Sequence, residues 1–167
     1  MNFQLTKIKK IILGLDLGIS NLGYAVLVSD GIIKNYIVYN CFFTSKFIST
    51  SERILKIYLF LEQLLITYSP NLVCIEKVFH TNNTKTFSVI NQVHGAILAL
   101  LASKKLLLLE ITPIQVKLYN GLKSNCKKQE IIIRMKSVFK IKNNNYKKND
   151  DAFDALAISN TFFYLFT

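Results

Sequence analysis

Four carboxylates occupy positions that are better explained by metal binding or catalysis than by packing in the core. Asp16 ends an apolar segment of Ile, Leu and Gly, and Glu76 directly follows another apolar segment. Asp151 and Asp154 are three positions apart, so a helix would place both on one face. Acids gathered at one place repel unless a cation compensates them, and oxygen-only ligands favour Mg²⁺ or Mn²⁺ over zinc. A pair of such ions can activate water and stabilise the leaving oxygen of a phosphodiester.

Each acid also has a purely structural explanation. Asp151 or Asp154 alone is typical of the first turn of a helix, where the helix dipole favours acids. Asp16 could be a turn residue at the end of a strand. Glu76 has the weakest explanation of this kind, because a charge after Val-Cys-Ile rarely helps packing. The four acids together indicate a metal site more specifically than any one of them.

The elements that must position these acids follow from the spacing of apolar residues. Strands are expected at Ile11–Leu17, Gly23–Val28, Ile32–Phe43, Leu72–Ile75 and Leu106–Ile111, and helices from the capping box Ser49–Glu52 to Pro70, at Thr84–Ala102, after Thr112-Pro113, at Gln129–Phe139 and from near Asp150. This order predicts one α/β domain over residues 1–167, with a five-stranded mixed sheet flanked by helices. Ligands of such sheets gather at the carboxyl ends of strands, where adjacent central strands would bring Asp16 beside Glu76.

The charge of the chain favours a polyanionic partner. The formal net charge is +11, and residues 103–150 hold twelve lysines and arginines against three acids. Lysine outnumbers arginine 19 to 2, however, so a coding sequence rich in A and T would explain part of this charge. Charge therefore supports a nucleic-acid partner without establishing one.

Cysteine usage and hydropathy bear on the compartment. Cys41, Cys74 and Cys126 form no CxxC pattern, which favours a reduced, cytoplasmic chain without a zinc site. The longest apolar stretch, Ala96–Ala102, is far shorter than the ~20 residues that a membrane span requires. Three lysines before Ile11 imitate a signal peptide, but Asp16 interrupts the apolar run and no cleavage site follows. We expect no membrane partner.

Three segments resemble, in order and spacing, the signatures of RuvC-type Holliday junction resolvases. They are Ile12–Gly18 with Gly23-Tyr24, Ile75–Phe79 and Asp151–Ala157, within a resemblance that runs from Ile11 to about Ser159. The resemblance implies an RNase H-like fold, a homodimer and a Mg²⁺-dependent endonuclease. Such an enzyme makes paired nicks in four-way junction DNA during homologous recombination and DNA repair. It also implies cooperation with a branch-migration helicase.

The resemblance assigns roles to seven residues of this chain. Its catalytic, metal-binding acids fall on Asp16, Glu76, Asp151 and Asp154. Phe79 matches an aromatic residue that stacks on junction bases, although it could equally be a core residue after a strand. Lys117 and Lys128 match two basic positions near the scissile phosphate. A solvated lysine is the alternative for both, and Lys127 leaves the alignment open by one position.

Several segments depart from the family pattern. Asp16-Leu-Gly18 replaces Asp-Pro-Gly, and Val93-His-Gly95 replaces Ala-Arg-Gly. His94 is more typical of a helix surface or core edge than of a ligand. Gly121–Lys128 replaces a glycine-rich loop, so the preferred cleavage sequence does not follow from the resemblance. The apolar end, Phe162–Phe166, has no functional explanation.

A homodimer would need a surface, and Thr84–Ala102 has more apolar residues than one sheet face can cover. We expect the contact to include Val89, Val93, Ala96 and Leu100, unless a neighbouring helix covers them.

Three other functions are open: another RNase H-like nuclease that acts on structured RNA or DNA, a fragment of an actin- or Hsp70-like ATPase, and an inactive DNA-binding protein. The ATPase needs a second domain and more glycines than the six present.

Overall fold

The computed structural model describes residues 9–30, 34–78, 83–142 and 150–166. The strands are β1 (Lys10–Asp16), β2 (Asn21–Ser29), β3 (Lys34–Phe43), β4 (Leu72–Glu76) and β5 (Leu107–Ile111). The helices are α1 (Thr50–Tyr68), α2 (Thr84–Ser103), α3 (Pro113–Tyr119), α4 (Lys128–Val138) and α5 (Asp150–Leu165). The predicted order of strands and helices is confirmed, with ends that differ by one or two residues; the predicted start of the third strand, Ile32, lies outside the described residues.

The five strands form one mixed sheet in the order β3-β2-β1-β4-β5. β1, β2 and β3 pair antiparallel, whereas β4 and β5 continue the sheet parallel to β1. Leu15 of β1 pairs with Ile75 of β4, so Asp16 and Glu76 follow at the same edge of the sheet. Because β1 and β4 pair in parallel, both acids leave the buried part of the sheet at the same edge.

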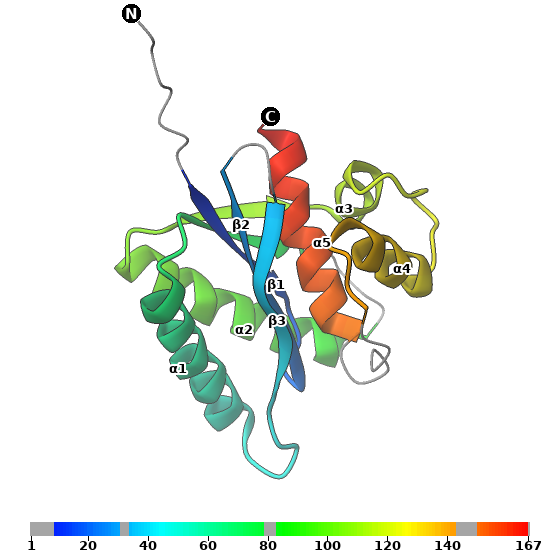
Figure 1. Ribbon diagram of the computed structural model, residues 1–167. Coiled ribbons are helices and arrows are strands. Elements are labelled where there is room, and N and C mark those ends of the chain that lie inside the picture. Colours follow the sequence, from blue (N-terminus) through cyan, green and yellow to red (C-terminus); the bar gives the residue numbers. More distant parts are fainter. Residues whose placement is uncertain (1–8, 31–33, 79–82, 143–149, 167) are drawn as a thin grey trace, which may run out of the picture.

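The helices cover the two faces of the sheet, as predicted (Figure 1). α1 and α2 lie on one face, and α5 lies on the other with α3 and α4 beside it. Side chains alternate between the faces along β1: Leu13 and Leu15 pack with the α1–α2 side, and Ile12 packs with the α5 side. Each fully buried side chain of this size stabilises the fold by roughly 1.5–3 kcal/mol relative to exposure.

Two glycines allow α5 to approach the sheet closely. A Cβ atom at Gly14 would clash with the carbonyl oxygen of Ala155 and lie 2.7 Å from Ser159 Cβ. At Gly23 it would clash with the carbonyl oxygen of Asp151. The first turn of α5, which carries Asp151, therefore rests directly on β2.

A buried polar network joins α3 and α4 to α5. Asn120 Nδ2 donates hydrogen bonds to Ala157 O (3.1 Å) and Thr161 Oγ1 (3.0 Å), and Asn160 Nδ2 donates to Asn120 Oδ1 (2.8 Å). Arg134 Nε of α4 donates to Asn120 O at 2.7 Å. Breaking one member of a buried network leaves its partners unsatisfied, so the network fixes how α3 and α4 dock on α5.

The expected dimer surface on α2 is partly wrong. Val93 and Leu100 are 0% exposed and pack in the core between α2, α1 and the sheet, because they lie on the inner face of the helix. The outer face instead carries the exposed residues Ser88, Asn91, Gln92, Gly95, Leu98 and Ala99.

α2 is also the one described helix that is long and apolar enough to cross a membrane by length and composition. Its packed inner face is that of a core helix.

Candidate metal centre and nucleic-acid interface

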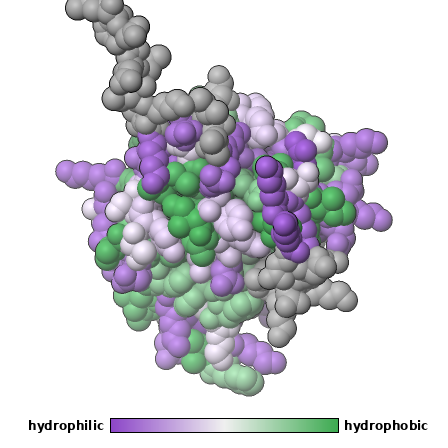
Figure 2. Space-filling view, viewed as in Figure 1, coloured by the Kyte–Doolittle hydropathy of each residue, from purple (hydrophilic) through white to green (hydrophobic). Residues whose placement is uncertain are grey.

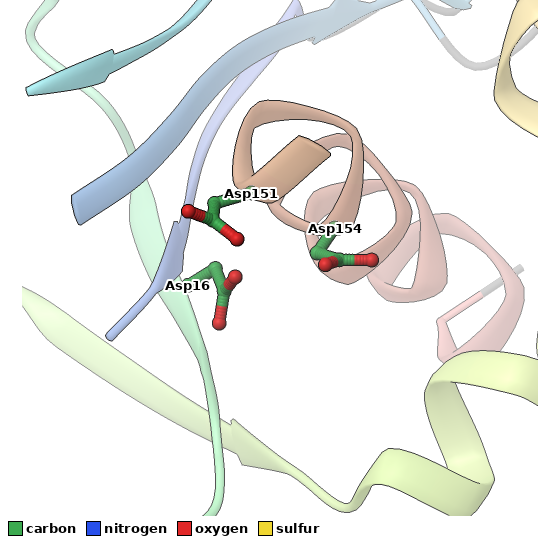
Figure 3. A group of neighbouring side chains, drawn as sticks. All are labelled: Asp16, Asp151 and Asp154. Atoms are coloured by element: carbon green, nitrogen blue, oxygen red, sulfur yellow. The ribbon is translucent and has the colours of Figure 1, made fainter. Parts of the chain in front are cut away.

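Three of the four predicted acids meet at the carboxyl edge of the sheet. Asp16 comes from the end of β1, Asp151 comes from the first turn of α5, and Asp154 comes from the next turn of that helix (Figure 3). One carboxylate oxygen of each lies within 4.8 Å of the other two. Glu76, at the end of β4, is outside this group but close enough to influence the charge of Asp16.

Burial and repulsion between neighbouring carboxylates disfavour the ionised forms of Asp16, Glu76 and Asp154. Burial, followed in order of effect by the charges of Asp154, Asp151 and Glu76, raises the pKa of Asp16 to about 8. Burial also raises the pKa of Glu76 and of Asp154. A half-buried, oxygen-only donor set of this kind is stabilised by a hard divalent cation, so the residues present fit a metal such as Mg²⁺ or Mn²⁺.

Lys128 lies directly against the acids. Its Nζ is 2.7 Å from Asp151 Oδ1 and 2.9 Å from Asp154 Oδ2. Burial lowers the pKa of Lys128, but its hydrogen bonds to these carboxylates outweigh burial and raise the pKa. The adjacent Lys127 is exposed, and its backbone N–H donates to Glu130 Oε1. Of the two neighbouring lysines, Lys128 is thus the one that faces the acids.

Lys117 approaches the site from α3. Its Nζ donates a hydrogen bond to Ser124 O at 3.1 Å, and its charge opposes the rise in the pKa of Glu76. In the space-filling view, hydrophilic side chains gather on the right-hand rim where α3 and α4 lie (Figure 2). Within the basic stretch predicted from the sequence, Lys128 contacts two of the acids and Lys117 acts on the charge of Glu76.

Of two further sequence candidates, the described one, His94, stands apart from the cluster. His94 Nε2 lies 3.3 Å from Glu110 Oε1 of β5, and His94 belongs to no metal-binding group among the described residues. Phe79, the predicted stacking residue, lies outside the described residues.

Sequence reasoning missed residues that position the site without touching a ligand. Gly14 and Gly23 admit α5 to the sheet, and glycine inside a strand was the available signal for such a close approach. Asn120 and Asn160 dock α3 on α5, and an asparagine within an apolar helix was the signal there. Burial raises the pKa of the Cys41 thiol to about 11, and the charge of Asp151 adds to this rise. Cys41 therefore lies close enough to the acids to be influenced by them.

A mixed sheet in this order, with acids at the carboxyl edge of β1 and on a helix that packs against the sheet, defines an RNase H-like fold with a candidate metal centre. The family model described as "Crossover junction endodeoxyribonuclease RuvC" matches residues 12–162. The chain belongs to the RuvC family.

Relatives and solved structures agree with this assignment. RuvC of Alkaliphilus metalliredigens is 33% identical over 89% of this chain and 90% of its own length. RuvC of Prochlorococcus marinus is 31% identical over 90% of this chain and 94% of its own length. Among solved structures, Thermus thermophilus RuvC in complex with a Holliday junction substrate aligns with a TM-score of 0.80 at 22% identity, covering 93% of this chain and 94% of its own. That structural likeness supports the predicted fold.

Proposed function

We propose that this chain is a metal-dependent endonuclease that resolves four-way (Holliday) DNA junctions by paired symmetric nicks during homologous recombination and DNA repair. The observation that carries the proposal is the meeting of Asp16, Asp151 and Asp154 within 4.8 Å in a chain of the RuvC family. The names of its relatives and the substrate of the Thermus thermophilus complex support the choice of substrate.

The four acids would hold the metal, with Asp16, Asp151 and Asp154 as the central ligands and Glu76 as a further ligand at the edge. Two Mg²⁺ ions per site, for which Mn²⁺ would substitute, would supply an activated water and stabilise the leaving oxygen. The protein's own contribution would be to hold these carboxylates at the ends of two strands and on a helix that packs against the sheet.

Lys117 and Lys128 would act on the phosphodiester. Both lysines border the acids, and an ammonium group there stabilises the negative charge that develops on the phosphate during cleavage. Phe79 would stack on bases of the opened junction, a contact that tolerates any sequence.

We also propose a homodimer, because one protomer has a single set of acids whereas a four-way junction presents two equivalent strands to cut. The outer face of α2 suits the contact. Nothing lies within 4 Å of a Cβ atom built at Gly95, and Leu98 is 42% exposed. A second copy of α2 could therefore approach closely and cover apolar surface. Residues 1–167 would act as one nuclease domain in the cytoplasm, with a branch-migration helicase as partner.

In the direct test the protein is incubated with three substrates of matched base sequence. These are a mobile four-way DNA junction, a linear DNA duplex and a folded RNA. Nicks at symmetric positions on opposing junction strands, dependent on Mg²⁺, are expected. Preferential cutting of the RNA or the linear duplex would instead assign the chain to another RNase H-like activity. ATP hydrolysis without cutting would favour the ATPase alternative.

A further inference from the structure

The acids proposed to hold metal are already paired with a cation of the protein itself. Lys128 Nζ contacts both Asp151 Oδ1 and Asp154 Oδ2, at 2.7 and 2.9 Å. Both carboxylates belong to the group whose ligand atoms lie within 4.8 Å of one another. The same two carboxylates thus serve a lysine in this structure and a metal ion in the proposed mechanism.

These two arrangements exclude each other in part. A carboxylate oxygen that accepts a short, charge-assisted hydrogen bond offers less of its charge to a second cation, and the two cations repel. Lys128 can leave, because its side chain is 43% exposed and its ammonium sits on a flexible stem. The start of α4 is held separately, by the 2.9 Å hydrogen bond from Lys127 N to Glu130 Oε1.

We propose that Lys128 is the internal counter-ion of Asp151 and Asp154 in the metal-free protein and competes with divalent metal for these carboxylates. Its release when they bind metal makes the ammonium available to a DNA phosphate. The inference rests on the proposed function, because it takes the acids as metal ligands. It adds an order of events: Lys128 faces the phosphate only when the acids have exchanged it for metal.

Lys117 provides a matched comparison within the same site. It carries the same charge and influences Glu76, but its Nζ is held by Ser124 O. Removing Lys117 deletes a nearby positive charge without freeing a carboxylate. Removing Lys128 deletes a charge and also frees two carboxylates, so the two variants separate general electrostatics from competition.

The experiment is calorimetric titration of Mn²⁺ into the full chain without DNA, for the wild type, Lys128→Gln and Lys117→Gln. Lys128→Gln should bind Mn²⁺ roughly tenfold more tightly than the wild type, because a charged hydrogen-bonded pair no longer competes. Lys117→Gln should differ by less than about threefold. Lys128→Gln should also cut junctions more slowly despite its tighter metal binding. Equal Mn²⁺ affinity of Lys128→Gln and Lys117→Gln would overturn the competition.

A second measurement needs no variant. Brief acetylation of the wild type, read by mass spectrometry, should modify Lys128 more in Mg²⁺ than in EDTA, with Lys127 as the internal reference. An unchanged ratio would contradict release of Lys128. If the wild type binds metal and cuts junctions while Lys128→Gln binds Mn²⁺ no more tightly, this inference fails and the proposed function stands. A wild type that binds no metal defeats both.

Discussion

At the scale of single residues, Asp16 carries the largest electrostatic cost of the site. It is enclosed by the end of β1 and faces Asp151 and Asp154 on α5, so burial and like charges both oppose its ionisation. A metal ion would reverse this balance, because the carboxylate that is costly to ionise in the free protein would become a ligand. The same residue therefore links stability, metal affinity and pH.

The pKa of about 8 at Asp16, against an ordinary value of 3.8, predicts how the stability of the metal-free protein depends on pH. The folded state holds this proton more tightly than the unfolded state, so Asp16 contributes less to the free energy of unfolding as pH rises from about 4 to about 8. In EDTA, the melting temperature of the wild type should fall relative to Asp16→Asn across this range. Parallel melting temperatures of the two proteins would contradict the assigned pKa.

Charge removal at the acids gives the second prediction. Asp16→Asn, Glu76→Gln, Asp151→Asn and Asp154→Asn keep the shape of each side chain but lose the charge that holds metal. Each should cut junctions at least about 100-fold more slowly and bind them nearly as well as the wild type. Nicking and gel-shift assays on one preparation measure both quantities. Asp150→Asn is the control on the same helix turn, and it should cut normally. Normal cutting by the Asp16 or Glu76 variant would refute the metal site.

At the scale of elements, the site depends on how α5 is seated. Gly23→Ala should push Asp151 outward, since a Cβ atom there clashes with its carbonyl oxygen. We expect a loss of about 1–3 kcal/mol in the free energy of unfolding, together with weaker metal binding. Chemical denaturation measures the loss, and Asn35→Ala, on the exposed part of β3, should change stability by less than about 0.5 kcal/mol. Full stability of Gly23→Ala would show that α5 can shift without cost.

Most elements were predictable because their signals are local. The Ser49–Glu52 capping box starts α1, and Thr112 with Pro113 starts α3, where the sequence places them. The edge shared by Asp16 and Glu76 followed from two apolar strands and a general rule for parallel sheets.

The inner face of α2 was less predictable, because apolar residues surround the helix. Only the position of α1 and the sheet decides that Val93 and Leu100 face inward while Leu98 faces outward. The pairing of Lys128 with two acids 23 and 26 positions later was equally hidden, since it depends on how α4 docks against α5. These features could not be predicted from the sequence, because they depend on how distant elements pack together and not on local propensity.

At the scale of the whole molecule, the outer face of α2 is the surface on which the proposed dimer depends. Leu98→Glu or Ala99→Glu would place a charge in an apolar contact between two copies of this helix, so light scattering should show monomers at concentrations where the wild type is dimeric. Ile133→Glu, at a residue of α4 that is 66% exposed, is the matched control and should leave the assembly unchanged. If both α2 variants remain dimeric, the contact lies elsewhere.

Two copies of this site are proposed to cut opposing strands of one junction. A supercoiled plasmid that extrudes a cruciform tests it most directly, because a single nick relaxes the plasmid and removes the junction. Paired nicks made within one complex convert the plasmid to a linear molecule, whereas independent nicks leave an open circle. With Mg²⁺ the wild type should yield linear plasmid, and Asp154→Asn should yield neither product. Open circles as the sole product of the wild type, at protein concentrations that saturate the cruciform, would contradict the account.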